Sequence, residues 1–245
     1  EWCMSQQAYF LSTDYADDKA IDISQLQTYS TRQQAFILRY WFDLLGVHHP
    51  TEKNFQRLFV DLLSAGTDTK AEVVWKNYVL KRFDAALFCL PISINTDLGF
   101  TEELHLPSTQ EQFIVKDLPY GRLEVSLMAT DDMAQHQINI GYNKEKEGFE
   151  IYCHIQDSLE SVRVRSRLGG DKIYLQSNHS TTIKKLYQSH KILPWHRNKL
   201  PLICSEATLI GTLAGFVAKE FAPDNKKVEP KNSSRKFYCF RFKFT

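Results

Sequence analysis

A chain of 245 residues, 43% of them hydrophobic, is long enough for one large domain or two smaller ones with buried cores. Its 30 Lys and Arg residues nearly balance its 29 Asp and Glu residues, so the net charge of +1 indicates no partner by itself. The five scattered cysteines form no zinc-like or C-x-x-C pattern, and no apolar run approaches the ~20 residues of a membrane-spanning helix, so we expect reduced thiols in a cytoplasmic protein without a membrane segment.

The first 92 residues predict a small helical domain with a β-hairpin. Residues 1–30 are interpreted as the remnant of an incoming helix and a connector, from a longer protein, because the chain opens without Met or a signal-peptide pattern. A helix is expected from Thr31, capped by Ser30 or Thr31 and ended by Gly46, and a second helix after Thr51. The stretch "EVVWKNYVLKRFDAALFCLPI", residues 72–92, predicts two strands around the turn Asp84-Ala85. The apolar helical positions are Phe36, Ile37, Tyr40, Trp41, Leu44 and Leu45 in the first helix, and Phe55, Leu58, Phe59 and Leu62 in the second.

Residues 93–110 are irregular and acidic, and are expected to link this domain, residues 31–92, to a second one at residues 111–245. The second domain is predicted to be a mixed, strand-rich α+β fold. Its strand-like runs are "QFIVKDL", "GRLEVSLM", "HQINIGY", "FEIYCHI" and "VRVRSR", followed by a helix within residues 181–203, a hairpin in "LPLICSEATLIGTLAGFVAKEF" and a closing strand in "SRKFYCFRFKFT".

The chain shows no catalytic constellation. The stretch Ser64-Ala65-Gly66-Thr67-Asp68-Thr69 is similar to a phosphate-binding S-G-G-x-D-S loop, but it follows a helix and lacks the first glycine, so Gly66 is interpreted as a helix C-cap. The pair His48-His49 is expected in a turn, and Glu102-Glu103 and Asp131-Asp132 in solvated loops. We therefore expect no catalytic residue, cofactor or metal in this chain.

The basic residues are concentrated in the second half of the chain. From Ile151 onward there are 17 Lys and Arg against 7 Asp and Glu, a net charge of +10. This asymmetry favours a nucleic-acid or anionic partner over the alternative of a merely solvated basic face. Arg163, Arg165 and Arg167 are spaced to project from one face of a strand, where phosphate suits their guanidinium groups.

A helix after Thr181 or Thr182 is expected to pack Ile183, Leu186, Tyr187 and His190 into the core and to present lysines outward. Trp195 could stack on a base or pack inside, and both interpretations stay open. The candidate RNA-binding residues are Arg163, Arg165, Arg167, Lys172, Lys184, Lys185, Trp195, Arg197 and Lys199.

The order of these features resembles the tRNA(Ile)-lysidine synthase family. "IKKLYQSHKILPWHRNKLPLI", the hairpin with "LAGFVAKEF" and the preceding turn from Arg167 to Lys172 resemble its C-terminal domain. "TRQQAFILRYWFDLLGVHHPTEKNFQRLFVDLLSA" and "VVWKNYVLKRFDAALFCLP" look like its helical substrate-recognition domain and hairpin. The resemblance implies a terminal fold akin to one in the phenylalanyl-tRNA synthetase beta chain, which contacts the acceptor-stem region.

The same resemblance implies an enzyme that uses ATP and Mg to join lysine to C2 of the wobble cytidine in a CAU-anticodon tRNA(Ile). That chemistry is expected in an N-terminal domain missing from this chain, so lysine and ATP would act only through that domain. A homodimer stays open, and the alternative function is a stand-alone RNA-binding module.

Overall fold

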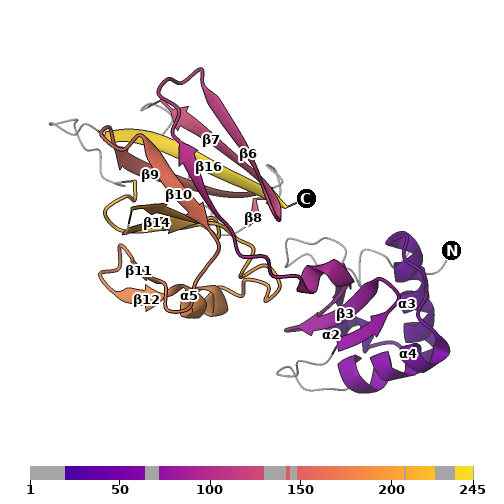
Figure 1. Ribbon diagram of the computed structural model, residues 1–245. Helices are drawn as coiled ribbons and strands as arrows, with labels where there is room; N and C mark the ends of the chain where they lie inside the picture. Colours follow the sequence, from indigo (N-terminus) through magenta and orange to yellow (C-terminus); the bar gives the residue numbers. More distant parts are fainter. Residues whose placement is uncertain are drawn as a thin grey trace. The chain divides into compact units, whose positions relative to one another are not determined.

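The computed structural model describes residues 20–63, 72–129, 142–143, 148–206, 208–223 and 235–244 (Figure 1). The chain divides into two compact units, residues 1–96 and 97–245. The expected remnant helix before residue 20, the stretch Ser64–Thr69, the pair Asp131-Asp132 and most of "HQINIGY" lie outside the described residues. Among the described residues, no helix is both long and apolar enough to cross a bilayer.

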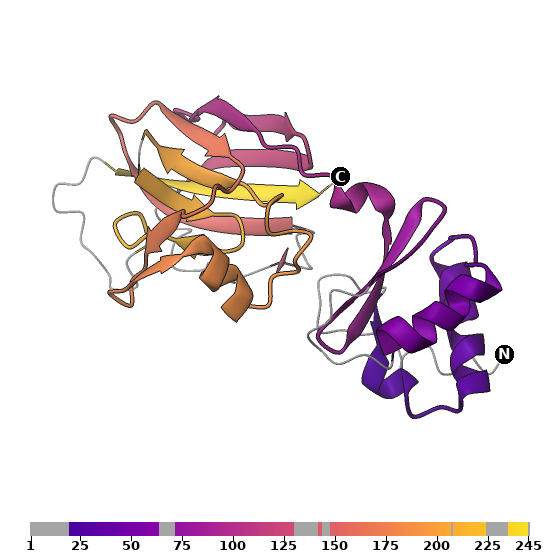
Figure 2. The same cartoon turned by 60° about the horizontal axis from the view of Figure 1, so that its bottom comes forward.

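In the N-terminal unit, helices pack on one face of a four-stranded antiparallel sheet of order β1-β4-β3-β2 (Figure 2). The helical elements are α2 (Ile23–Leu26), α3 (Thr31–Leu44), α4 (Glu52–Arg57), the π-helix η1 (Leu58–Leu63) and the 3-10 helix η2 (Ile92–Asn95). The strands are β1 (Ile21–Asp22), β2 (Glu72–Trp75), β3 (Tyr78–Phe83) and β4 (Ala86–Pro91).

Helix α3 begins and ends where the sequence predicts, but its buried face is different. Ser30 and Gln33 form a capping box, and Gly46 follows the helix with a φ of 66°. Phe36 and Leu44, which follow the apolar helical spacing, are exposed, because the buried stripe is displaced by one residue along the helix. The buried α3 residues are Ile37, Leu38, Trp41 and Phe42.

Two further elements extend the predicted hairpin into a sheet. Residues 72–91 form three strands, since a second turn at Lys76-Asn77 precedes the predicted turn at Asp84-Ala85. The segment assigned to a connector supplies β1, which pairs with β4, and α2, whose Ile23 and Leu26 are buried. The N-terminal unit therefore uses residues before Thr31 in its core.

The C-terminal unit is strand-rich, as predicted for an α+β fold, with two five-stranded sheets, a two-stranded hairpin and one helix among its described residues (Figure 1). One sheet has the order β6-β7-β16-β9-β8 and the other β15-β14-β13-β10-β5, while β11 pairs with β12. The elements are β5 (Thr101–His105), β6 (Phe113–Leu118), β7 (Gly121–Met128), β8 (Tyr142–Asn143), β9 (Gly148–Gln156), β10 (Ser161–Arg165), β11 (Lys172–Tyr174), β12 (Ser180–Thr182), α5 (Ile183–Ser189), β13 (Leu202–Ser205), β14 (Thr208–Thr212), β15 (Phe216–Val217) and β16 (Arg235–Phe244).

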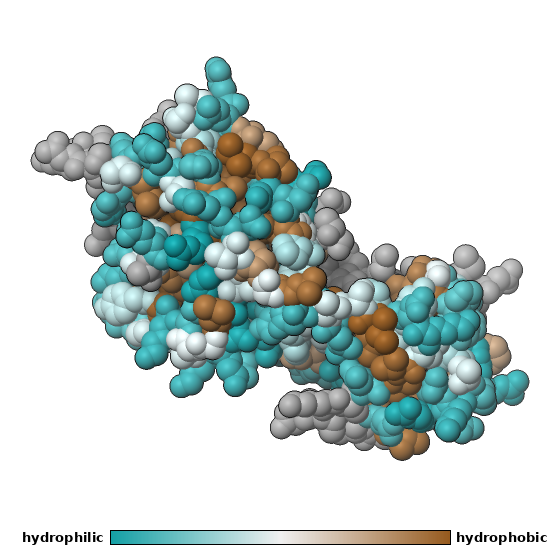
Figure 3. All heavy atoms as spheres, viewed as in Figure 1, coloured by the Kyte–Doolittle hydropathy of each residue, from teal (hydrophilic) through white to brown (hydrophobic). Residues whose placement is uncertain are grey.

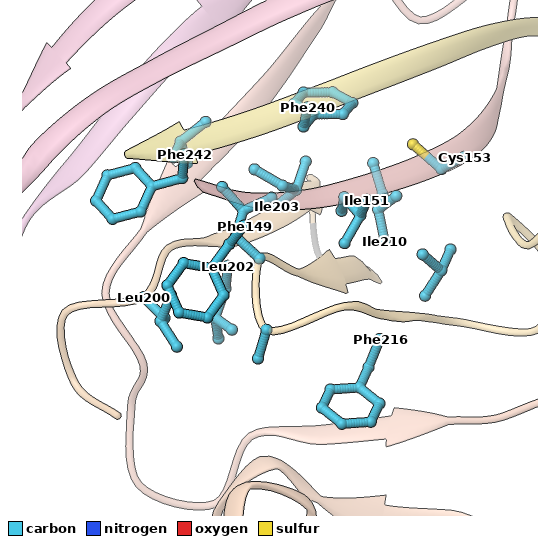
Figure 4. Close-up of a cluster of buried hydrophobic side chains, with 14 of the residues drawn as sticks. Phe149, Ile151, Cys153, Leu200, Leu202, Ile203, Ile210, Phe216, Phe240 and Phe242 are labelled. Carbon is cyan, nitrogen blue, oxygen red and sulfur yellow. The ribbon is translucent and has the colours of Figure 1, made fainter. Parts of the chain in front are cut away.

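The two sheets bury their facing side chains in one core (Figure 4). Phe149, Ile151 and Cys153 of β9 lie opposite residues of the β13–β15 side. Gly211 of β14 lies so close to this sheet that an added Cβ would be 3.0 Å from Ile151 Cδ1. Burial of these apolar groups is the main stabilisation of the unit.

Strand β16 lies in the middle of its sheet and pairs antiparallel with both β7 and β9. Its Arg241 is in register with Glu124 on β7 and Glu150 on β9, and forms ion pairs with both carboxylates. Opposite charges facing each other across strands favour this register over a slipped one.

The predicted linker at residues 93–110 contains regular structure, because η2 continues to Asn95 and a strand follows it. Its residues 101–105 form β5, which pairs with β10 at the edge of a sheet. The acidic sequence "TEELH" does not show the alternation of a strand, because Leu104 is the one buried residue of β5. Glu102 of this strand forms an ion pair with Lys116 at 2.9 Å. An edge strand needs few apolar residues, so periodicity alone gives a weak signal.

Candidate nucleic-acid interface

The predicted basic residues lie in the C-terminal unit, on β10, on the segment between β10 and α5, on α5 and on the loop that follows α5. Figure 3 shows that hydrophilic and near-neutral side chains cover most of the visible face over β11, β12 and α5. The nine candidate residues do not behave alike, because some are held by neighbouring groups and others extend into solvent.

Arg163 and Arg165 point away from the core on β10, where Val162 and Val164 between them are buried. Arg163 is exposed and donates a hydrogen bond to the Glu206 carbonyl at 3.2 Å. The predicted common strand face does not extend to Arg167, because β10 ends at Arg165, opposite the first residues of both neighbouring strands. Two arginines, not three, therefore share the strand face.

Arg165 forms a bidentate ion pair with Asp171. Its two terminal nitrogens lie 2.9 and 2.8 Å from the carboxylate oxygens, and the two side chains are only 17% and 14% exposed. The amide of Leu168 also donates to Asp171, at 2.6 Å. Burial favours a raised pKa for Asp171, but the hydrogen bonds from Arg165 and Leu168 outweigh it and lower that pKa. Arg165 thus closes the turn at residues 166–171, and its charge is already matched.

Arg167 and Arg197 lie near each other on the far side of this turn. Arg167 donates two hydrogen bonds to Asn198 Oδ1, at 2.6 and 3.3 Å, and Asn198 donates to Asp97 at 2.8 Å. Burial, and then the adjacent Arg167 charge, lower the pKa of Arg197. Two guanidinium groups that repel each other in this way are suited to sharing an anion such as phosphate.

Trp195 and Lys199 are packed into the unit. Trp195 is 9% exposed, so the packing alternative describes its position. Lys199 is 7% exposed, and its ammonium lies 5.1 Å from the centre of the Tyr120 ring. Lys199 was predicted to be presented to solvent and is not, because the loop after α5 folds inward.

Lys172, Lys184 and Lys185 are exposed and form no ion pair with any carboxylate in the described part of the chain. Helix α5 holds the last two outward: Thr182 caps it by accepting from the Lys185 amide, while Ile183, Leu186 and Tyr187 are buried as predicted. His190 was expected in the core but is exposed, because α5 ends at Ser189. The centre of its ring lies 4.6 Å from the centre of the Phe216 ring. The ammonium groups of the three lysines are therefore exposed and face no described carboxylate, unlike the guanidinium of Arg165.

Half-buried His196 makes the unit sensitive to acid. Burial, and then the neighbouring Lys199 charge, lower the pKa of its imidazole from 6.5 to about 4. Between these values the unfolded chain binds a proton that the folded chain does not, so stability rises with pH through this range and falls on acidification. We expect wild type to lose about 1–3 kcal/mol more than His196→Gln between pH 6.5 and 4, measured by urea unfolding. Equal losses in both proteins would contradict this pKa.

Sequence reasoning missed Tyr174, Lys219 and Arg235, which line one hollow together with Lys172. The alternation in "KIY" of β11 was the available signal, because it places Lys172 and Tyr174 on the same exposed face. Among the described residues, no group of His, Cys, Asp and Glu could hold a metal ion.

Two family models match the chain. Residues 21–88 match the TilS substrate binding domain, and residues 162–229 match the TilS substrate C-terminal domain. The second range contains all nine candidate residues, from Arg163 to Lys199.

Curated relatives carry the name tRNA(Ile)-lysidine synthase. The protein of Serratia proteamaculans is 30% identical over 203 residues, which cover 83% of this chain and 41% of that protein. The protein of Haemophilus ducreyi is 26% identical over 205 residues, which cover 80% of this chain and 42% of that protein. A solved structure described as "Crystal structure of TILS C-terminal domain" aligns at a TM-score of 0.39 and 18% identity, over 60% of this chain and 98% of that one. The chain spans about two fifths of the length of the curated relatives that it matches.

Proposed function

Because the chain belongs to the tRNA(Ile)-lysidine synthase family and matches its C-terminal portion, we propose that it is the tRNA-binding part of such a ligase. The whole protein would use ATP and Mg to attach lysine to C2 of the wobble cytidine of a CAU-anticodon tRNA(Ile) in the cytoplasm. The chemistry would take place in a domain other than the two described units. A stand-alone RNA-binding module remains the alternative.

The observation that carries this proposal is a set of exposed lysines, Lys172, Lys184 and Lys185, that pair with no carboxylate among the described residues and lie within the range matched by the C-terminal domain model. A-form RNA presents phosphates and 2′-hydroxyls on its surface and hides its base edges in a deep groove. Exposed lysines on a rigid strand and helix suit that surface. In this proposal the C-terminal unit holds the acceptor stem through its backbone, with Arg163, Arg167 and Arg197 adding to the positive surface.

The proposal is tested by titrating the 245-residue chain against a CAU-anticodon tRNA(Ile) transcript at several salt concentrations. We expect the logarithm of the binding constant to fall linearly with the logarithm of salt, by about 0.7–0.9 for each phosphate contacted. Absence of binding at low salt would refute the proposal. Lysine ligation by this chain alone would refute the assignment of chemistry to another domain.

The gene sequence upstream of Glu1 separates the two candidate functions. An S-G-G-x-D-S motif between a predicted strand and a predicted helix would support the ligase. An upstream sequence that encodes no such motif would support the stand-alone module.

A further inference from the structure

A hollow of about 710 Å³ lies between β11, β14 and the segment that follows β15. Its volume is within the range of about 300–1,000 Å³ common for small-ligand sites. The residues that matter chemically are Lys172, Tyr174, Lys219, Glu220 and Arg235. Among the nine candidate RNA-binding residues, only Lys172 lines this hollow.

Tyr174 offers an aromatic surface in this hollow. Its side chain is 48% exposed, whereas its neighbour Ile173 is 2% exposed and anchors β11 in the core. The Tyr174 carbonyl accepts a hydrogen bond from the Lys219 amide at 2.8 Å, which ties β11 to the chain after β15. The backbone that carries the Tyr174 ring is therefore fixed by this hydrogen bond, while the ring itself is half exposed and does not pack into the core.

Positive charge surrounds this ring. The Lys219 ammonium lies 5.8 Å from the ring centre and is hydrogen-bonded to the side-chain oxygen of Asn178, while Lys172 extends from the same face of β11. Arg235 donates a hydrogen bond to the backbone carbonyl of Glu220 at 3.2 Å. Because a carbonyl is neutral, this bond does not neutralise the charge of the Arg235 guanidinium. Glu220 is the one carboxylate that lines the hollow among the described residues, against three cations.

An exposed aromatic ring flanked by cations is the arrangement that binds unpaired nucleotides, because the ring stacks on a base and the cations hold the adjacent phosphates. A paired stem cannot use the ring, since its bases are stacked inside the helix. We propose that Tyr174 stacks on a base of the unpaired 3′ end of a tRNA acceptor stem, with Lys172 and Lys219 on the flanking phosphates. This inference rests on the proposed function, which places the acceptor stem on the C-terminal unit.

The test compares two RNA hairpins of the same stem, one blunt and one with a short unpaired 3′ extension, binding to the 245-residue chain by fluorescence anisotropy. We expect the extension to tighten binding by about 5- to 100-fold, the range that base stacking on an aromatic ring produces. Tyr174→Ala should remove this gain and leave blunt-stem binding unchanged, while Tyr174→Phe should retain it. The matched control is Phe113→Ala, which removes another exposed ring, 57% exposed on β6, and should change neither affinity.

The outcomes separate the two proposals. If the blunt stem binds and the extension adds nothing, or if Tyr174→Ala weakens both RNAs equally, the stacking site is wrong and the proposed function stands. If neither RNA binds, the proposed function fails and the stacking site fails with it. Free cytidine monophosphate that binds as tightly as the extended stem would overturn the assignment to an RNA end. A 2-aminopurine in the extension supplies a second readout on wild type, since its fluorescence should fall on stacking and stay unchanged if the ring is unused.

Discussion

Replacing Asp171 by alanine is expected to lower the free energy of unfolding of the C-terminal unit by about 2–4 kcal/mol. The substitution leaves the Arg165 guanidinium, only 17% exposed, without its bidentate partner and removes the acceptor of the Leu168 amide. Urea unfolding at neutral pH measures the change. The pKa of Asp171 lies below its ordinary value of 3.8, so its contribution is fully present above that pH and is lost as the pH falls through the folded-state pKa.

The matched control is Asp117→Ala. Asp117 pairs with Arg122 at 3.0 Å, but its side chain is 77% exposed, so its removal should cost no more than about 1 kcal/mol. In the Asp171→Ala background, Arg165→Ala should cost far less than it does in wild type, because the two residues act as one unit. Equal effects of Asp171→Ala and Asp117→Ala would show that the pair does not stabilise the turn.

Replacing Lys184 and Lys185 together by alanine is expected to weaken tRNA binding by about 10- to 50-fold near 0.1 M salt and to reduce the salt slope by about 1.4–1.8. Both side chains are exposed on α5 and neither has a carboxylate partner in the described part of the chain, so their loss should not unfold the unit. Anisotropy titrations with a tRNA(Ile) transcript over a range of salt concentrations measure both quantities.

The control for this variant is the double substitution Lys116→Ala and Arg122→Ala. It also removes two cations, but each of these is already paired, with Glu102 and Asp117 respectively. If the salt slope is unchanged after the α5 substitutions, or if the control loses as much affinity, then Lys184 and Lys185 do not contact the tRNA and are only solvated. Arg165 is unsuitable for such a test, because its substitution would disturb the turn before it disturbed any RNA contact.

Helix caps and strand alternation within a few residues predicted the ends of the helices and the long strands correctly. The cap at Ser30, the cap at Thr182 and the long alternating strand β16 all follow from residues within a few positions of one another. The strand-rich α+β class follows from the number of alternating runs. Strand β5 was missed because it is polar and pairs with β10, about sixty positions later in the chain. The hairpin β11–β12 was missed because each of its strands has only three residues, most of them polar.

The candidate site shows the same division. Exposure of Lys184 and Lys185 follows from helical spacing against Ile183, Leu186 and Tyr187, and was predicted. Burial of Lys199 depends on Tyr120, about eighty positions earlier in the chain, which periodicity does not detect. The pairing of Arg165 with Asp171 depends on how Gly170, with a φ of 89°, turns the chain back on itself. Charge counting alone therefore overstated the number of arginines that are available for phosphate.

The central position of β16 has a consequence for synthesis of the protein. Glu124 on β7 and its partner Arg241 on β16 are 117 positions apart, so the ribosome makes β7 and β9 well before the strand that joins them. Until β16 emerges, the facing edges of those two strands have unpaired backbone groups, which are prone to pairing with other chains. The C-terminal sheet is thus expected to assemble late and slowly, and to need protection from aggregation while translation is still under way.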